Sequence, residues 1–405
     1  MESYSYILDI ALILISTKLF GLISRRCQMP QVVGALFAGL ILGPAVLNIV
    51  HETEFLTQLA EIGVILLMFF AGLETDISEL KQSGKASLVT AILGIIVPLA
   101  GGFFVAMYFN RHGLIPFEAK ANAFLQNIFI GTILTATSVS ITVETLKEMG
   151  KLNSKVGNTI LGAAIIDDIL GIIALTIVIS FANPDVHIFE VLLKIFCFFI
   201  FAAIASGIFY FIFKNWLDKD SKHKRRYVIA AFAFCLLLSY ISETYFGVAD
   251  ITGAFIAGLT LSPISKKYYI GDKLDTVSYA LLSPIFFASI GLKLVLPKMT
   301  PMIILFAIIL TIVAVLSKVV GCSLGCKLFN YSNSESLQVG IGMVSRGEVA
   351  LIVANKGFSA GLINTTVLAP ILIVVIATTI LSPILLKMSY NYEIKKNKEK
   401  LDAIS

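Results

Sequence analysis

The chain has little charge for its length. Of its 405 residues, 57% are hydrophobic and only 14% are charged, whereas charged residues make up about a quarter of an ordinary soluble domain. Because a soluble protein needs a polar exterior, this composition excludes a soluble fold. Apolar runs longer than the ~18 residues that mark a membrane-spanning helix recur along the chain. The alternating pattern of a β-barrel strand is missing, so helices remain as the spanning elements.

Cysteines and histidines are also scarce, with five and four in the whole chain. Most of the cysteines fall inside apolar runs, so the loop-borne pairs of a disulfide framework are missing. Cys322 and Cys326 lie four positions apart without a histidine or a third cysteine nearby, which favours small packing residues over a metal site. We expect no cofactor. The net charge of +5 does not indicate a nucleic-acid partner, because most basic residues lie in loops beside apolar runs.

The apolar runs predict an all-α polytopic membrane protein with about thirteen spans and no soluble domain. The first run, "YSYILDIALILISTKLFGLISRR", is not a secretory signal, because its positive charges follow the apolar stretch and no small-residue cleavage site is evident. The predicted spans cover about 5–24, 31–50, 55–75, 86–109, 122–146, 155–181, 187–214, 226–246, 248–264, 274–293, 299–328, 334–357 and 363–389.

The basic residues predict the orientation. They gather in alternate loops, and the loops in between carry few of them. Basic loops of membrane proteins stay on the cytoplasmic side, so we predict an N-terminus outside and a C-terminus in the cytoplasm, which fits an odd number of spans. The basic loops hold Arg25 and Arg26, Lys81 and Lys85, Lys147, Lys151 and Lys155, the stretch 214–226, Lys266, Lys267 and Lys273, Lys327, and the tail from Lys387.

The sequence contains a weak internal repeat. Residues 34–44 read "GALFAGLILGP" and residues 253–263 read "GAFIAGLTLSP". The next spans match as "FFAGLE" and "FFASIGLK", and a later pair as "TATSVSITV" and "SRGEVALIV". An odd number of spans separates the members of each pair, so the second copy enters the membrane from the opposite side. Inverted-topology repeats of this kind are typical of secondary transporters.

Two adjacent acids, Asp167 and Asp168, lie in the apolar run "GAAIIDDILGIIAL". They follow Lys155 by twelve and thirteen residues, which places them roughly 18–20 Å deep in a helix that rises 1.5 Å per residue. Neighbouring helix positions diverge by about 100°, so the two carboxylates face different neighbours. A buried acid of this kind holds either a proton or a small cation, and the alternative is an acid satisfied by an ion pair.

Further polar residues lie in two other spans. Lys318, in "AVLSKVVGC", needs a carboxylate partner at its depth, and we assign it to one of the two aspartates. Hydroxyls crowd the stretch "TATSVSITV", and its repeat partner carries Arg346 and Glu348. Matching polar, glycine-interrupted stretches predict two broken helices. Arg346 and Glu144 are candidates to compensate the exposed helix ends, and an ion pair that holds the fold is the alternative for Arg346 and Glu348. Glu74 and Asp250 lie at span ends and are expected at the interface.

The motifs "TATSVSITV", "GAAIIDDILGI", "LSKVVG" and "SRGEVALI", in that order, resemble those of the monovalent cation:proton antiporter superfamily, in particular its second branch of bacterial sodium/proton antiporters. The resemblance covers essentially the whole chain. It implies a fold of thirteen helices with two crossed, discontinuous helices. It also implies a core domain including about 55–181 and 274–389 and a dimer domain including about 5–50 and 187–264.

The resemblance also implies roles for individual residues. Asp168 is implied to be the main carrier of Na⁺ and H⁺, and Asp167 the partner of Lys318. Thr137 and Ser138 are implied to supply oxygen ligands near the ion. The family works as homodimers in the bacterial cytoplasmic membrane by an elevator motion, and the "DD" pair with the lysine resembles its electrogenic members.

Several functions remain open at this point. The favoured one is exchange of Na⁺ or Li⁺ for H⁺, with cation and proton competing for Asp168. A K⁺/H⁺ or Na⁺/H⁺-K⁺ exchanger is the alternative, because potassium-efflux and spore-germination antiporters share much of the pattern. A cation channel would conduct without proton coupling. An intramembrane aspartyl protease is disfavoured, because its two aspartates must converge on one water from separate helices; we therefore expect no enzyme.

Overall fold

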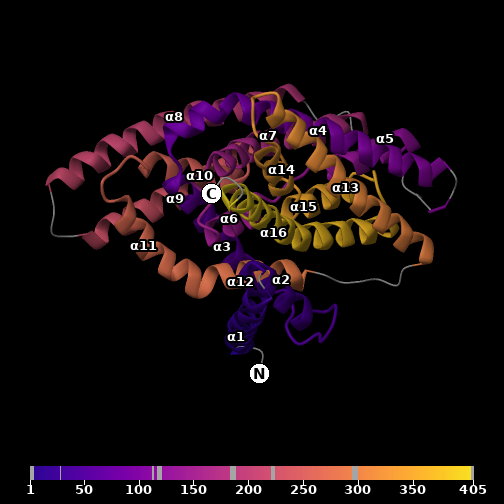
Figure 1. The fold of residues 1–405 in the computed structure, drawn as a ribbon, viewed down its shortest axis with the longest axis horizontal. Helices are drawn as coiled ribbons and strands as arrows, with labels where there is room; N and C mark the ends of the chain where they lie inside the picture. Colours follow the sequence, from indigo (N-terminus) through magenta and orange to yellow (C-terminus); the bar gives the residue numbers. More distant parts are fainter. Residues whose placement is uncertain are drawn as a thin grey trace. The chain divides into compact units, whose positions relative to one another are not determined.

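The computed structural model describes residues 4–27, 29–111, 114–115, 121–182, 188–219, 224–293 and 300–402, and every regular element in these ranges is helical (Figure 1). In chain order the elements are α1 (Ser5–Arg26), α2 (Gln31–Leu42), α3 (Glu54–Glu74), α4 (Ile77–Arg111), α5 (Ala123–Ile133), α6 (Val139–Glu148), α7 (Lys155–Ala182), α8 (Ile188–Lys219), α9 (Lys224–Phe246), α10 (Asp250–Leu261), α11 (Lys267–Val277), the π-helical segment η2 (Ser278–Leu282), α12 (Ser283–Leu292), α13 (Pro301–Lys327), α14 (Asn333–Gly342), α15 (Glu348–Ser359) and α16 (Thr365–Asp402).

Nine spans in the described ranges are long and apolar enough to cross a membrane. They are formed by α1, α3, α4, α7, α8, α9, the continuous run from α11 to α12, α13 and α16. The helices α2, α5, α10 and α15 are apolar but shorter. The prediction of an all-helical, multi-pass membrane protein is therefore confirmed, whereas the exact number of thirteen spans stays a prediction.

Two of the predicted spans are discontinuous. The span expected over 122–146 is interrupted between α5 and α6, and the span expected over 334–357 is interrupted between α14 and α15. Threonine and serine hydroxyls compete for the backbone at the first break. At the second, Gly347 has a non-helical backbone with φ −142° and ψ −136°. The breaks fall at matching places of the two sequence copies, as expected for an inverted repeat.

Several helix ends differ from the predicted span ends. α4 begins at Ile77, so Lys81 and Lys85 are helical and do not form a loop. Its start is set by Asp76, whose carboxylate accepts a hydrogen bond from the backbone N–H of Ser78 at 2.7 Å. α16 likewise continues far beyond the predicted end at 389. An apolar run indicates the part of a helix that lies in lipid, and a polar end is free to continue the helix beyond it.

The described chain forms two compact units. The first comprises residues 1–20, 34–82 and 187–293. Its helices approach closely at glycines of the repeated motifs. A Cβ atom on Gly258 of α10 would collide with the carbonyl oxygen of Phe69 in α3, and one on Gly72 of α3 would collide with that of Phe255 in α10. α2 and α12 meet in the same way at Gly39 and Gly291.

The second unit comprises residues 21–33, 83–186 and 294–405, and it contains both broken helices together with α7 and α13. Within it, α13, α14 and α16 pack side by side, and α15 lies against α16 (Figure 1). Phe109 of α4 and Phe306 of α13 form an edge-to-face pair with ring centroids 5.0 Å apart in its apolar core. Asp167, Asp168 and Lys318 all lie in this unit. The predicted core and dimer domains stay a prediction, because compactness does not show which part moves or dimerises.

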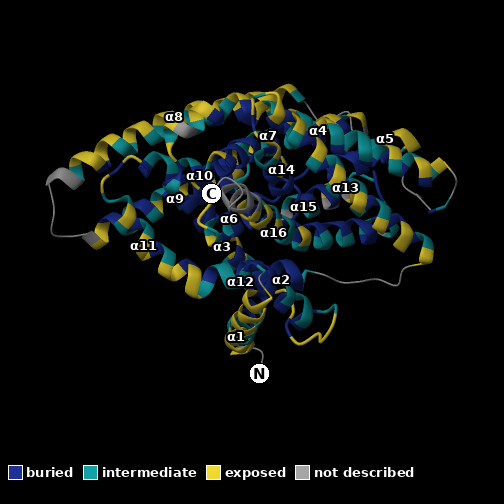
Figure 2. Ribbon diagram, in the orientation of Figure 1, coloured by how far each residue is buried: buried dark blue, intermediate teal, exposed yellow. Residues whose placement is uncertain are grey.

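Large apolar side chains remain exposed along whole helices. α8 is exposed over most of its length (Figure 2). Water would make such a surface costly, since each fully buried large apolar side chain is worth about 1.5–3 kcal/mol. The exposed surface is consistent with a lipid bilayer around the chain. On α8 it comprises Phe189, Leu192, Leu193, Phe196, Ile200, Ile204, Ile208, Phe211 and Ile212.

Candidate functional site

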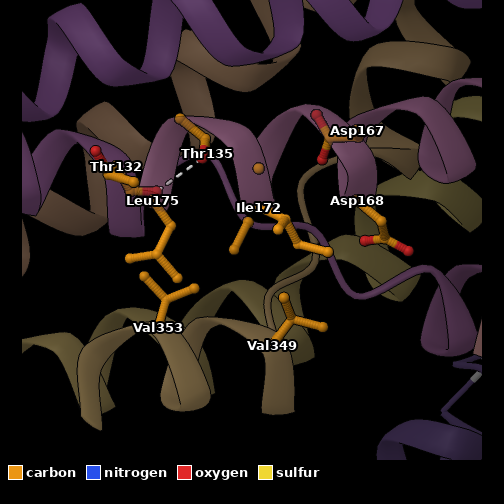
Figure 3. Close-up of a pocket in the computed structure, with 10 residues that line it drawn as sticks. Thr132, Thr135, Asp167, Asp168, Ile172, Leu175, Val349 and Val353 are labelled. Carbon is orange, nitrogen blue, oxygen red and sulfur yellow. Dashed lines mark hydrogen bonds between the residues drawn. The ribbon is translucent and has the colours of Figure 1, made fainter. Parts of the chain in front are cut away.

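The two adjacent aspartates of α7 point in different directions. Asp167 is buried, with 2% of its surface exposed, and Asp168 is partly exposed. Figure 3 shows the two carboxylates on different sides of the helix. The 100° step between consecutive helix positions produces this divergence. Each carboxylate therefore has its own surroundings, and the two are free to have separate roles.

Lys318 of α13 is fully buried and is paired with Asp167. Its Nζ atom lies 3.1 Å from each carboxylate oxygen of Asp167. The same ammonium group donates to the carbonyl oxygens of Gly94 and Thr135, each at 2.8 Å. The residues alone left open which aspartate faces the lysine, the family resemblance implied Asp167, and the structure brings Asp167 to it. All three hydrogens of Lys318 are matched by acceptors, as a buried ammonium group requires.

Thr137 and Ser138 lie in the break between α5 and α6. The hydroxyl of Thr137 donates to the carbonyl oxygen of Met343 at 3.5 Å. The hydroxyl of Ser138 lies 3.3 Å from that of Ser140, and the carbonyl of Ser138 accepts a hydrogen bond from the Ser345 hydroxyl. Thr137 and Ser138 thus both contact the segment around the second break, and neither is among the residues that line the cavity at Asp168.

Arg346 joins the two breaks. Its guanidinium group is buried and donates to the carbonyl oxygens of Leu134 at 2.6 Å, Val344 at 2.9 Å and Ala314 at 3.1 Å. Leu134 is the C-cap of α5, so the positive charge lies at the negative end of that helix dipole. The backbone also links the breaks directly, since the N–H of Ser138 donates to Ser345 at 2.7 Å.

The remaining predicted residues lie farther from these contacts. Glu144 is partly exposed on α6, within the half-helix that follows the first break. The side chain of Glu348 lies outside the described residues, although its backbone begins α15. Thr379 of α16 donates through its hydroxyl to the carbonyl of Arg346 and so ties a third helix to the second break.

Asp168 lines a small cavity inside the second unit (Figure 3). The cavity has a volume of about 40 Å³, enough for a few water molecules at roughly 10–15 Å³ each. Its polar lining comes from Asp168, Asp167 and two threonines, Thr132 and Thr135. The other lining residues are Ala136, Gly171, Ile172, Leu175, Val349 and Val353.

Thr132 is the polar lining residue that the sequence did not single out. Its position three residues before Thr135, at the end of the same predicted span, is the signal that could have found it. A carboxylate and hydroxyl oxygens form a hard-oxygen site, which suits small cations better than soft metals. In the described ranges, no group of three His, Cys, Asp or Glu side chains comes together as transition-metal sites usually require.

Comparisons with known proteins agree on one family. The family model described as "Sodium/hydrogen exchanger, transmembrane" matches residues 11–388. The chain is 40% identical to the Na⁺/H⁺-K⁺ antiporter GerN of Bacillus cereus over 396 residues, covering 98% of this chain and 99% of that protein. It is 38% identical to the Na⁺/H⁺ antiporter of Enterococcus hirae, covering 93% and 96% of the two chains.

A solved structure shares the fold. The sodium proton antiporter MjNhaP1 of Methanocaldococcus jannaschii aligns with a TM-score of 0.70 over 96% of this chain and 97% of its own, at 20% identity. The identity is too low to carry residue roles across. The relatives are transporters, and none of those compared is an enzyme.

Proposed function

Because the chain belongs to the sodium/hydrogen exchanger family, whose members compared above are cation/proton antiporters, we propose that it exchanges Na⁺ or Li⁺ for H⁺ by competition at Asp168. The observation that carries this assignment is the division between the two aspartates. Both carboxylates line a cavity that has room for a small ion and water. Asp167 is buried and held by Lys318, whereas Asp168 is partly exposed and points to another side of the helix. Asp168 is thus placed to exchange its occupant.

Competition at one carboxylate explains coupling. A protonated Asp168 has no charge to hold Na⁺, and a bound Na⁺ disfavours the proton. Each loaded form is close to neutral, whereas the empty carboxylate carries a charge that costs at least about 2.5–3.5 kcal/mol in the membrane interior. The loaded site therefore changes its access between the two sides far more readily than the empty one, and the gradients set the direction of exchange.

We further propose the arrangement in the membrane. The charge pattern places the N-terminus outside and the C-terminus in the cytoplasm of a bacterium. The transporter works as a homodimer in which the core domain moves against the dimer domain. The exposed apolar side chains of α1 and α8 leave surface for both lipid and a second subunit.

A second candidate is an exchanger that also carries K⁺. It is favoured by one observation, that the 40%-identical relative GerN is a Na⁺/H⁺-K⁺ antiporter. Hydroxyl and carboxylate oxygens bind both ions, so the ligand types do not decide between the candidates.

Reconstituted protein tests the proposal. Proteoliposomes with an internal pH dye receive Na⁺, Li⁺ or K⁺ outside, and proton movement is recorded for wild type and Asp168→Asn. We expect Na⁺- and Li⁺-driven proton movement in the wild type and a loss to background in the variant, because Asn neither ionises nor carries a proton. The matched control is Asp272→Asn, which changes an exposed aspartate of α11 and should retain exchange. Exchange that survives Asp168→Asn would refute the site.

A further inference from the structure

The cavity at Asp168 extends along the last turn of α5. Thr132 and Thr135 line it from this helix and its C-terminal end, and Leu175 lines it from α7 (Figure 3). Gly171 of α7 lines it as well. Gly171 and Leu175 follow Asp168 toward the end of α7 that lies away from Lys155. In the predicted orientation this end faces the outside, so the cavity lies on the outer side of Asp168.

Each of the two threonine hydroxyls already donates its proton in a hydrogen bond to a backbone carbonyl. The hydroxyl of Thr132 donates to the carbonyl of Ile128 at 3.0 Å, and that of Thr135 donates to the carbonyl of Thr132 at 2.7 Å. A hydroxyl has one proton and two acceptor lone pairs. Each oxygen therefore has lone pairs left over and no further proton to donate, and such an oxygen suits a cation.

The carbonyl oxygens of the breaks are largely occupied by the protein itself. Arg346 donates hydrogen bonds to the carbonyls of Leu134 and Val344, and Lys318 donates one to that of Thr135. The Ser345 hydroxyl takes the carbonyl of Ser138. A cation at Asp168 would have to share most of these carbonyls with the ammonium or guanidinium group that already binds them and repels it, so the side-chain oxygens beside the cavity gain importance.

We propose that the hydroxyl oxygens of Thr132 and Thr135 replace water ligands of the cation as it approaches Asp168 and thereby determine cation preference. This inference rests on the proposed function and names the specificity residues of the same site. Small ions hold their hydration water most strongly, so they need replacement oxygens more than K⁺ does. The two threonines therefore favour Li⁺ and Na⁺ over K⁺.

Thr132→Val and Thr135→Val test the inference, because valine keeps the shape and removes the oxygen. Initial exchange rates are measured against external Na⁺, Li⁺ and K⁺ in the proteoliposomes described above. We expect the KM for Na⁺ and Li⁺ to rise about tenfold in either variant, as for the loss of one charge-assisted contact. The KM for K⁺ should change much less, and the maximal rate should persist. Thr132→Ser, which restores the oxygen, should restore the KM.

Thr176→Val is the matched control. Thr176 lies on α7, is buried, and donates its hydroxyl to the carbonyl of Ile172 at 2.7 Å, but it is not among the residues that line the cavity. If Thr132→Val does not reach wild-type abundance, the KM values for Na⁺ and Li⁺ are compared between Thr132→Ala and Thr132→Ser instead. These two variants also differ in the hydroxyl oxygen, so they test the same inference. Unchanged KM values in an active transporter would overturn the inference alone. A wild type that exchanges no cation for protons would overturn the proposed function as well.

Discussion

At the scale of single residues, the groups that most need partners in the described part of the chain are two buried cations, Lys318 and Arg346. Lys318 has one carboxylate and two carbonyl acceptors, and Arg346 has three carbonyl acceptors. Both act on the carbonyl end of α5, where the helix dipole is negative and the chain leaves the helix. A backbone broken in the interior would otherwise leave unsatisfied carbonyls, each costing about 1–3 kcal/mol. The hydrogen bonds from the two cations thus offset the cost of unsatisfied carbonyls at the first break.

Arg346→Met should destabilise the protein. The variant keeps much of the side-chain volume but leaves the carbonyls of Leu134, Ala314 and Val344 without this donor. We expect a loss of about 2–4 kcal/mol, visible as a lower unfolding temperature in detergent. Arg346→Lys should recover part of the lost stability, because lysine keeps the positive charge but lacks the planar guanidinium group with its several donors. Arg25→Met, at an exposed position of α1, is the control, and an equal loss there would contradict the structural role of Arg346.

The residue scale also shows what the sequence could predict of the site. A lysine and an acid pair deep in apolar runs require partners, so the Lys318–aspartate pair was predictable in kind. The residues alone do not show which aspartate pairs, because this depends on how α7 is rotated against α13; Asp167 was implied by the family resemblance. Thr132 was missed because a lone threonine in a membrane helix usually bonds its own backbone, as Thr132 also does.

At the scale of elements, the repeated glycines explain how the first unit is built. Two of the close approaches pair a motif of one sequence copy with a motif of the other. Gly72 of "FFAGLE" meets α10, and Gly291 of "FFASIGLK" meets α2. A helix pair whose backbones touch gains dispersion contacts that lipid cannot replace, and only glycine permits that distance. The weak sequence repeat therefore corresponds to two equivalent helix crossings, that of α3 with α10 and that of α2 with α12.

Gly258→Ala should disrupt one of these crossings. The added Cβ atom would collide with backbone atoms of Phe69, so α3 and α10 must separate. We expect a destabilisation of about 1–3 kcal/mol, measured as a lower unfolding temperature. Gly207→Ala, in the exposed face of α8, has open space around the new methyl group and should be neutral or slightly stabilising. Equal effects of the two variants would show that the crossing does not depend on Gly258.

The positions of the helices were predictable where long apolar runs are separated by polar segments. Hydroxyl and glycine clusters inside long apolar runs indicated both broken helices. Helix ends were less predictable. The stretch expected as a basic loop after 265 is helical from Lys267 and continues through the π-helical η2 into α12. Hydropathy does not distinguish a helix that leaves the membrane from a loop.

At the scale of the whole molecule, the proposed exchange together with the pair of Asp167 and Lys318 predicts the number of protons per cation. In the proposed exchange, Asp168 supplies one exchangeable proton. If the cation also attracts Asp167, Lys318 loses its counter-ion and, in an apolar interior, releases a second proton. Two protons per Na⁺ move one net charge, and a potential of 100 mV then contributes about 2.3 kcal/mol per cycle.

Lys318→Gln should therefore remove the voltage dependence. Glutamine still donates hydrogen bonds toward Gly94 or Asp167 but has no proton to release, so one proton would be exchanged for one Na⁺. Sodium concentration jumps on a solid-supported membrane should give steady transport currents in the wild type. The variant should give none, although proton movement by a pH dye persists. Lys273→Gln, in the exposed face of α11, is the control. Currents of wild-type size in Lys318→Gln would show that this lysine does not carry the second proton.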